Sequence, residues 1–364
     1  MDQKLLDNII KSNRSVWQPK KYFKISKKGL YEVYFLIFHN KNRSESYWIR
    51  YTLLCNKNTK KVVENLNNKI SGGGLLWFGY FSSKDSKKNF MVKKHYSLAE
   101  VKGTFDKNDE TVFITIDKSY LSLQKALGSF STKSGKAFSW DLELTDFQQP
   151  YDIIPKLAKT LKITNTMNKA THPHIKISGK VKFNDEEVII DNCDAIQYHT
   201  YADGYKVPWE WFSIYNIPEW PRGYIDFSYK VDRGILEIFD GKKSFTPWNK
   251  NILTKLLASK KLIRKRSDSL VDFSLERDKK IISGTVSVDE NDLIGVEYVG
   301  PTGEKFYCYN SEIANSNLKI IDRKIYESQA FIIEGNVAFE TTTFKPVKGI
   351  NYLAWEDEEL SNST

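Results

Sequence analysis

The sequence predicts an all-β protein made of two successive halves, each an antiparallel barrel or sandwich. Aromatic residues make up 14% of the 364 residues, as 21 Phe, 20 Tyr and 9 Trp, and aromatic and β-branched side chains favour strands. Short runs rich in these residues recur along the chain, with Gly, Asn, Asp and Lys between them, as in antiparallel sandwiches and barrels. Helical periodicity is weak, at residues 251–262, so few short helices are expected.

The N-terminal half opens with a short amphipathic segment in which Leu5, Leu6, Ile9 and Ile10 lie on one side. A series of short strands bounded by turn residues follows. Residues 153–167 break this series, and they are compatible either with one or two helical turns or with an extended connection. The expected strands cover residues 29–39, 46–55, 74–81, 112–116, 137–144 and 174–183.

Two prolines in the sequence IPEWPR, residues 217–222, predict the boundary between the halves. We therefore expect an N-terminal β domain over residues 1–217 and a C-terminal β domain over residues 218–364. No clean internal sequence repeat accompanies this division. The expected strands of the second half cover residues 224–229, 234–239, 281–288, 295–299, 304–309, 318–321 and 330–339.

The composition is that of an ordinary globular chain. Charged residues make up 27%, mean hydropathy is -0.49, and no stretch approaches the ~20 apolar residues that a membrane span needs. Cys55, Cys193 and Cys308 lie far apart and form no CxxC pair. We therefore expect reduced thiols and a cytoplasmic protein.

The formal charge of +10 comes mostly from scattered lysines, which indicates a solvated surface and no nucleic-acid partner. Residues 260–266, KKLIRKR, form the one strong basic run. This run predicts either a solvated face or a peripheral contact with an anionic surface.

Residues 191–216, DNCDAIQYHTYADGYKVPWEWFSIYN, gather unusually many aromatic and titratable side chains. Alternate residues of an extended chain share a face, so Trp209 and Trp211 are expected to project together and Glu210 to project oppositely. His199 and Tyr201 share a face by the same rule. A carboxyl desolvated in an aromatic cavity would have a raised pKa and could protonate a bound double bond or carbonyl. The alternative is that the tryptophans pack in a core and that His199 is a hydrogen-bonded structural histidine.

His172 and His174 form an H-x-H pair that strand geometry would place on one face. With a third ligand such a pair can bind zinc or iron. Pro173 lies between them, and no stronger ligand spacing accompanies them. We therefore expect no metal and no other cofactor.

Five separated stretches carry a family resemblance: SYWIRYTLL at 46–54, LWFGYF at 76–81, HIKISGKVKFNDEEVII at 174–190, the 199–211 region, and LIGVEYVGPTGEKFYCYNSEIANSNLKI at 293–320. Together they resemble the carotenoid 1,2-hydratase (hydroxyneurosporene synthase)-like superfamily, most of all its uncharacterised members. The resemblance implies two tandem lipocalin-like barrels, with an isoprenoid or polyketide substrate in an aromatic pocket at or between them. His199 takes the place of the histidine in the family's His-Asn-Trp-Gly motif, whereas Thr200, Tyr201 and Ala202 replace its other residues.

We therefore expect a cofactor-free enzyme that acts on an apolar small molecule, such as an isoprenoid, polyene or polyketide, by proton-assisted hydration, cyclisation or isomerisation. A non-catalytic lipid or isoprenoid carrier, and a protein that only binds a partner through its surface, are the alternatives. Arg50 could anchor a polar group of the ligand or form a structural salt bridge. The expected acid–base residues are His199, Glu210 and Asp194, and the expected ligand-binding residues are Trp209, Trp211, Tyr201, Trp48, Arg50, Trp77, Tyr80, Cys308 and Asn310.

Overall fold

The structure is a computed structural model. It describes residues 2–16, 29–56, 72–104, 111–153, 166–183, 185–205, 207–230, 233–244, 263–267, 269–277, 280–301, 303–323 and 327–361.

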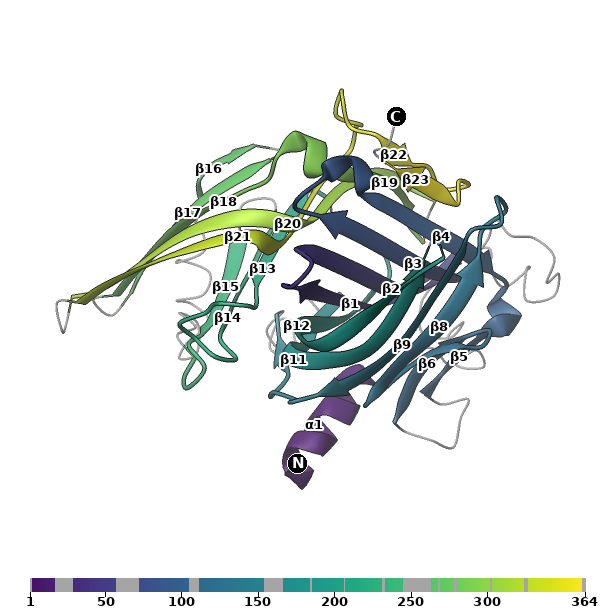
Figure 1. Cartoon of the computed structure of the whole chain (residues 1–364), viewed down its shortest axis with the longest axis horizontal. Helices are drawn as coiled ribbons and strands as arrows, with labels where there is room; N and C mark the ends of the chain where they lie inside the picture. Colours follow the sequence, from purple (N-terminus) through teal and green to yellow (C-terminus); the bar gives the residue numbers. More distant parts are fainter. Residues whose placement is uncertain are drawn as a thin grey trace.

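The described strands form two largely antiparallel sheets that lie against each other (Figure 1). The first is purple to teal, apart from the yellow β23, and the second is teal-green to yellow. The first sheet has the order β23-β4-β3-β2-β1-β12-β11-β9-β8-β7-β6-β5, with β10 paired to β11. Its strands are β1 (Gly29–Asn40), β2 (Glu45–Asn56), β3 (Gly72–Ser82), β4 (Phe90–Tyr96), β5 (Val101–Gly103), β6 (Val112–Ile116), β7 (Ser119–Ser122), β8 (Lys125–Ser131), β9 (Ala137–Thr145), β10 (Tyr151–Asp152), β11 (Met167–Phe183), β12 (Glu186–Ala202) and β23 (Glu359–Ser361).

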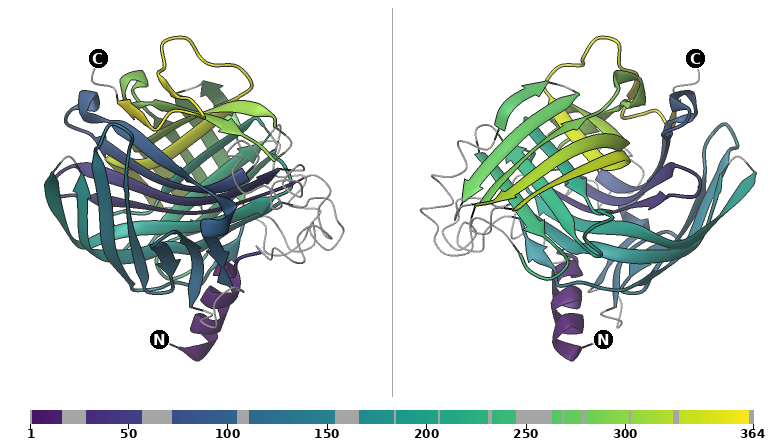
Figure 2. Two further views of the ribbon diagram at one scale, coloured as in Figure 1. Left: turned by 90° about the vertical axis from the view of Figure 1, so that its right-hand side faces the viewer. Right: turned by 60° about the vertical axis from the view of Figure 1, so that its left-hand side comes forward.

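The second sheet has the order β15-β14-β13-β21-β20-β18-β17-β16, and β19 links β20 to β22 beside this path. Both sheets curl strongly (Figure 2). The strands of the second sheet are β13 (Trp209–Ile214), β14 (Tyr224–Lys230), β15 (Arg233–Phe239), β16 (Ile263–Ser267), β17 (Leu270–Arg277), β18 (Lys280–Ser287), β19 (Ile294–Val299), β20 (Lys305–Asp322), β21 (Glu327–Thr343) and β22 (Tyr352–Leu353).

Strand alternation gives the first sheet two buried faces, as β2 shows. Tyr47, Ile49 and Tyr51 point into the core that the first sheet encloses by curling on itself. Trp48 points the other way, toward the second sheet, because successive side chains of a strand lie on opposite faces. The sequence ESYWIRYTLLCN has almost no polar alternation, as expected of a strand that is buried on both sides.

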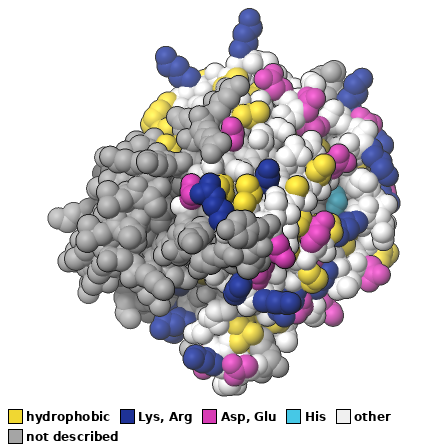
Figure 3. Space-filling view, turned by 90° about the vertical axis from the view of Figure 1, so that its left-hand side faces the viewer, with side chains coloured by type: hydrophobic (Ala, Val, Ile, Leu, Met, Phe, Trp, Pro, Cys, Tyr) yellow, Lys and Arg dark blue, Asp and Glu magenta, His cyan; other side chains and the backbone are white. Residues whose placement is uncertain are grey.

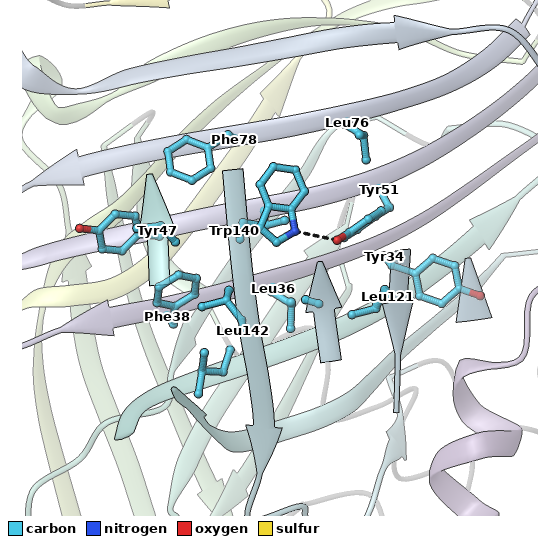
Figure 4. Packing of buried hydrophobic residues seen from close by; sticks show 14 of the residues in the cluster. Tyr34, Leu36, Phe38, Tyr47, Tyr51, Leu76, Phe78, Leu121, Trp140 and Leu142 are labelled. Carbon is cyan, nitrogen blue, oxygen red and sulfur yellow. Dashed lines mark hydrogen bonds between the residues drawn. The ribbon is translucent and has the colours of Figure 1, made fainter. Parts of the chain in front are cut away.

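The core of the first sheet is rich in aromatic residues (Figure 4). Trp140 is 1% exposed, and its indole nitrogen donates a hydrogen bond to the Tyr51 hydroxyl at 2.8 Å. Gly128 lies beneath the Trp140 ring, where a Cβ atom would come within 2.1 Å of it. The aromatic excess of the composition is thus used in part to fill a core at high density.

Helix α1 (Gln3–Asn13) closes this core from below, where Ile9 is fully buried and Leu5 and Leu6 pack against it (Figure 1). Asp2 accepts a hydrogen bond from the Lys4 backbone amide and caps the helix. The predicted amphipathic opening therefore forms a docked helix. No helix in the described residues is long and apolar enough to cross a membrane.

The C-terminal segment connects the two sheets. β22 pairs with β19 in the second sheet, and β23 then pairs with β4 in the first. The Lys93 amide donates to the Glu358 carbonyl oxygen at 2.8 Å, and the Lys133 amide donates to the Glu358 carboxylate at 2.7 Å. Residues 354–361 therefore connect the two sheets at the edge of the contact between them.

All of the expected strands form, but the bounds of three of them need correction. Residues 304–309 and 318–321 belong to the single 18-residue strand β20, because the polar residues between them are also extended. The strand at 174–183 is the second part of the 17-residue β11. The change of sheet falls between Ala202 and Trp209, since β13 pairs with β14 and β21; the division into domains at residue 217 stays a prediction.

Three expectations fall wholly or partly outside the described residues. They are the segment 153–167, the helical periodicity at 251–262 and the first part of the basic run 260–266. On the face of the second sheet in Figure 3, the described Lys and Arg side chains are interspersed with Asp and Glu.

Candidate functional site

The two sheets meet across a second buried cluster, which we call the inter-sheet cluster. It is formed by the strand faces that point away from each sheet's own core, and its members come from β1, β2, β3, β4, β11, β12, β13, β14, β19, β20, β21 and β22. Its largest side chains are those of Trp48, Trp77, Tyr198, Trp211, Tyr215, Tyr224, Tyr298 and Phe306, and Ile37, Ile196 and Cys308 pack among them.

Arg50 lies inside this aromatic cluster and is 6% exposed. Its guanidinium carbon is 5.5 Å from the ring centre of Trp48, 5.5 Å from that of Trp77 and 4.7 Å from that of Tyr298. Its Nε donates to Thr52 Oγ1 at 2.9 Å, and one terminal nitrogen donates to the Tyr298 hydroxyl. Among the described residues, no carboxylate oxygen lies within 4.0 Å of it. The expected structural salt bridge is therefore not formed there, and a buried charge left in this way is costly.

Lys93 is a second buried basic group in the same row of side chains. Arg50 lies opposite Trp77 in the register of β2 and β3, and Trp77 lies opposite Lys93 in that of β3 and β4. The Lys93 Nζ is 5.0 Å from the Trp77 ring centre and 5.2 Å from that of Trp355, and it donates to the Ala354 carbonyl oxygen at 2.5 Å. Burial lowers the pKa of Lys93 to about 7.

Trp209 and Trp211 each donate a hydrogen bond to a carboxyl group in this region. The indole nitrogen of Trp209 donates to Glu340, and the Thr342 hydroxyl accepts from the Trp209 amide at 2.8 Å. Burial raises the pKa of Glu340, although the Trp209 hydrogen bond and the Arg50 charge oppose this. The Glu340 carboxyl is thus biased toward its protonated form.

Asp226 is the partner of Trp211 and is 3% exposed. Trp211 Nε1 donates to Asp226 Oδ1 at 2.7 Å, and the Tyr151 hydroxyl, from the first sheet, donates to Oδ2. Burial raises the pKa of Asp226 to about 6, although hydrogen bonds from Tyr151, Tyr198 and Trp211 act to lower it. A carboxyl with this pKa can both give and take a proton near neutral pH.

The outer edge of the cluster is reached by solvent. Tyr205, Trp209 and Glu340 are only half-buried, whereas Tyr298 behind them is 3% exposed. Tyr205 stacks on Tyr31, with ring centres 3.9 Å apart, and also contacts Trp209. Solvent therefore approaches the buried polar groups from the side of the Tyr205 and Trp209 rings.

His199 lies on the other face of the first sheet, away from this cluster. Its Nε2 is 2.9 Å from Glu32 Oε1 and its Nδ1 is 2.9 Å from the Ser12 carbonyl oxygen. Its ring stacks on Tyr34, with centres 4.1 Å apart. This is the geometry of a hydrogen-bonded structural histidine that holds the end of α1. Tyr201 shares its face, with ring centres 5.7 Å apart.

Glu210 and Tyr80 also point away from the inter-sheet cluster. Glu210 is buried on the face of β13 opposite to the tryptophans, the face on which Phe212 joins the core of the second sheet. The Tyr80 hydroxyl donates to Glu45 Oε1 at 2.9 Å within the core of the first sheet. The structure therefore does not bring His199, Glu210 and Tyr80 to one place.

Asp194 occupies the face of β12 that Tyr198 shares, at the far end of the strand. His174 Nε2 lies 2.7 Å from Asp194 Oδ1, and Lys176 Nζ lies 2.7 Å from the same oxygen. Although burial acts to raise it, the hydrogen bonds from His174 and Lys176 lower the pKa of Asp194. An ionised carboxylate of this kind is a poor proton donor. His172 lies apart, 5.0 Å from the Phe147 ring.

Cys308 and Asn310 follow each other on the inter-sheet face of β20. The Cys308 Sγ is 3.6 Å from Asn310 Oδ1, and both side chains are buried. Burial raises the pKa of the Cys308 thiol, which argues against a thiolate nucleophile. No three His, Cys, Asp or Glu side chains within the described ranges are arranged to hold a metal ion.

A cleft of about 640 Å³ opens elsewhere, in the second sheet. Trp220, Ile282 and Ile320 form its apolar part. Its polar rim is mixed in charge, with Asp240 and Lys242 among its residues. Neither His199 nor Trp209 lines it.

The sequence did not indicate Asp226, Glu340 or Lys93 as site residues, yet each carries a recognisable signal. Asp226 interrupts the apolar run YIDFS, Glu340 follows the run NVAF, and Lys93 follows the run FMV. A charged residue within such a run is typical of a buried functional group when its alternate neighbours are also buried.

No family model and no curated protein matches the chain. Solved structures share its fold at low sequence identity. The structure of CghA is 6% identical, covers 86% of this chain and 88% of CghA, and has a TM-score of 0.50. The structure of CghA with Sch210972 is 7% identical to this chain and has a TM-score of 0.49, with the same coverage of both chains. A protein from Nitrosomonas europaea that is provisionally named AttH is 10% identical and has a TM-score of 0.46. The match covers 91% of this chain and 97% of that protein's chain.

At these identities the likeness concerns the fold alone. Together with the two observed sheets it confirms the predicted fold class, an all-β tandem lipocalin-like architecture with few short helices. Membership of the carotenoid 1,2-hydratase-like superfamily stays a prediction.

Proposed function

We propose that this chain is a cofactor-free enzyme that acts on an apolar small molecule at the inter-sheet cluster. The observation that carries the proposal is Arg50, a guanidinium 6% exposed among aromatic rings, with no carboxylate oxygen within 4.0 Å among the described residues. A chain does not gain stability from such a group. Perturbed and unbalanced charges of this kind concentrate at functional sites.

The substrate class follows from the surroundings of Arg50. Tryptophan and tyrosine rings would contact an isoprenoid, polyene or polyketide chain, and the guanidinium would orient one oxygen of it. CghA, which shares the fold, has been crystallised with Sch210972. That observation agrees with a small-molecule site in this architecture.

The chemistry would be proton-assisted cyclisation, isomerisation or hydration. Arg50 can polarise a carbonyl oxygen, on which negative charge develops, and Asp226 or Glu340 can supply or remove the proton. A free carbocation next to Arg50 would be disfavoured electrostatically. A substrate with a carbonyl conjugated to its double bonds therefore fits this site better than a plain alkene. We propose Asp226 and Glu340 in the acid–base roles first expected of His199, Glu210 and Asp194.

The test is extraction of the purified full chain with organic solvent, followed by mass spectrometry, with the same measurement on Arg50→Met and Asp226→Asn. We expect the parent chain to retain an apolar compound through purification. It should also convert more of this compound when an extract that contains it is added. Asp226→Asn should retain the compound unconverted, and Arg50→Met should lose it. Tyr80→Phe, altered in the core of the first sheet, is the matched control and should behave as the parent chain does.

Two results would count against the proposal. If Asp226→Asn and Glu340→Gln both leave conversion unchanged, the acid–base assignment is wrong. If no compound is converted by any variant but one is retained, the chain is a carrier.

A further inference from the structure

Two buried basic side chains contact the same indole ring. Arg50 and Lys93 lie on the strands that flank β3, each directly opposite Trp77 in register. Their charged ends lie 5.5 Å and 5.0 Å from the Trp77 ring centre. Both side chains point from the first sheet toward the second, where Tyr298 meets Arg50.

In the described part of the chain, no carboxylate contacts either group directly, although Glu340 acts on the Arg50 charge, and Asp357, Glu297 and Glu356 act on Lys93, at longer range. Among the described residues, no carboxylate oxygen lies within 4.0 Å of either nitrogen group, and Lys93 is 0% exposed. Glu340 is the carboxyl that shares the cluster, and it accepts from Trp209 instead. Aromatic faces attract a cation, but by less than the cost of removing its water.

Both groups also retain unused donors. A guanidinium has five N–H donors and an ammonium has three. Among the described residues, Thr52 and Tyr298 engage two of the donors of Arg50, which leaves three. Ala354 engages one of those of Lys93, which leaves two. Unused donors on a planar guanidinium suit a carboxylate, which can accept two parallel hydrogen bonds.

We propose that the ligand of the inter-sheet cluster is an anionic amphiphile, whose carboxylate binds Arg50 and Lys93 beside Trp77 and whose apolar chain extends between the sheets. This inference rests on the proposed function and names the substrate class. It places the carboxylate of the ligand, conjugated to its double bonds, at Arg50 on the first sheet, and the proton-transfer groups Asp226 and Glu340 on the second sheet.

The experiment compares a fluorescent carboxylate, 11-(dansylamino)undecanoic acid, with its methyl ester, titrated into the full chain at pH 6.5. The two probes differ only in the charge of the head group. We expect the acid to bind at least about tenfold more tightly than the ester, which is roughly 1.4 kcal/mol. Arg50→Met and Lys93→Met should each weaken the acid and leave the ester unchanged.

Two further variants serve as controls. Lys125→Met removes a surface lysine that pairs with Asp141 at 2.9 Å, and it should keep the preference for the acid. Arg50→Lys keeps the charge but not the planar fork, and it should keep part of the preference. Replacement of a buried charge by an apolar side chain of similar size commonly preserves folding.

The possible failures are distinct. If the acid and the ester bind equally to the parent chain, and Trp211→Ala weakens both, the anionic head group is refuted and the apolar site stands. If neither probe binds, or if no cluster variant affects either probe, both this inference and the proposed site are wrong.

Lys93 provides an independent readout. An anion bound beside it would raise its pKa, so that binding above pH 7 takes up a proton. Calorimetry at pH 8 in two buffers of different ionisation enthalpy should show proton uptake by the parent chain and none by Lys93→Met. Equal uptake by both would exclude Lys93 from the site.

Discussion

Two buried basic centres of this chain differ in how their charge is balanced. His199 is 0% exposed and lies 2.9 Å from the Glu32 carboxylate and 2.9 Å from the Ser12 carbonyl oxygen. The Ser12 carbonyl oxygen can only accept a hydrogen bond, so His199 Nδ1 donates to it, and Nε2 faces the Glu32 carboxyl group. Arg50 is almost as buried, but among the described residues it contacts hydroxyl groups and aromatic rings, and no carboxylate oxygen lies within 4.0 Å of it.

The network around Glu32 is also saturated. Ser15 Oγ and the Val16 amide donate to the Glu32 carboxylate, each at 2.8 Å, and the Tyr34 hydroxyl donates to the Asn13 carbonyl oxygen at 2.7 Å. These bonds tie the end of α1 and the residues after it to the first sheet. A satisfied buried pair of this kind holds the fold, whereas we propose that the unbalanced Arg50 serves a ligand.

The largest effect should come from breaking the satisfied pair. Glu32→Gln removes one partner of the buried His199–Glu32 pair, so the free energy of unfolding should fall by roughly 3–5 kcal/mol. Denaturant unfolding followed by circular dichroism measures it. His199→Gln should cost a similar amount, and the double variant should cost less than the sum. A loss below about 1 kcal/mol for Glu32→Gln would show that the pair is not ionic.

Lys93 should make stability rise with pH. Its pKa is about 7 in the folded chain because of burial, and near 10.4 when unfolded. Between these values the unfolded state binds more protons, so the free energy of unfolding should increase with pH, by at most about 4 kcal/mol. Denaturation of the parent chain and of Lys93→Met at pH 7 and 9 checks this.

The comparison with the variant is needed because other groups act in the opposite sense. Burial raises the pKa of Cys55, Cys308 and Tyr298, so these groups lower stability as pH rises above about 8.5. The difference between the two chains isolates Lys93. A pH-independent difference would mean that Lys93 stays charged.

Asp226 should have a smaller effect, in a lower pH range. Its pKa is about 6 in the folded chain because of burial and about 3.9 when unfolded. The folded state binds more protons between these values, so its contribution is complete below pH 4 and is lost as pH rises through 6, a change of about 3 kcal/mol. Asp226→Asn should remove this decline, measured as the difference in unfolding free energy between pH 4 and pH 7. An unchanged decline would place the titration elsewhere.

Much of the fold follows from the sequence because it depends on local pattern. Aromatic and β-branched runs between turn residues predict the strands, and alternation places Trp209 and Trp211 together, away from Phe212 and Glu210. These relations hold within one strand, where the geometry is fixed by the backbone. The two-sided burial of β2 is likewise visible in the lack of polar alternation in its sequence.

The partners of these residues do not follow from local pattern. Trp209 meets Glu340 across 131 positions of sequence, and Arg50 meets Tyr298 across 248. Only the order of strands in the second sheet, and its contact with the first, decide which carboxyl faces which tryptophan. The functional prediction for His199 came from the aromatic and titratable stretch at residues 191–216 and from a family motif. Its contacts in the structure are set by Glu32, which alternation alone could not select.

Arg50→Met should have the smallest effect on stability, and this outcome separates the two centres most sharply. Methionine keeps much of the volume and apolar contact of the arginine stem, while the cost of burying the charge disappears. Thr52 and Tyr298 each lose one hydrogen-bond donor, which offsets part of the gain. We expect the free energy of unfolding to stay unchanged or to rise by up to about 2 kcal/mol, in the same denaturant assay that shows a large loss for Glu32→Gln. A loss above about 2 kcal/mol would mean that charges of the chain itself balance Arg50, so that no anionic ligand is needed to balance it.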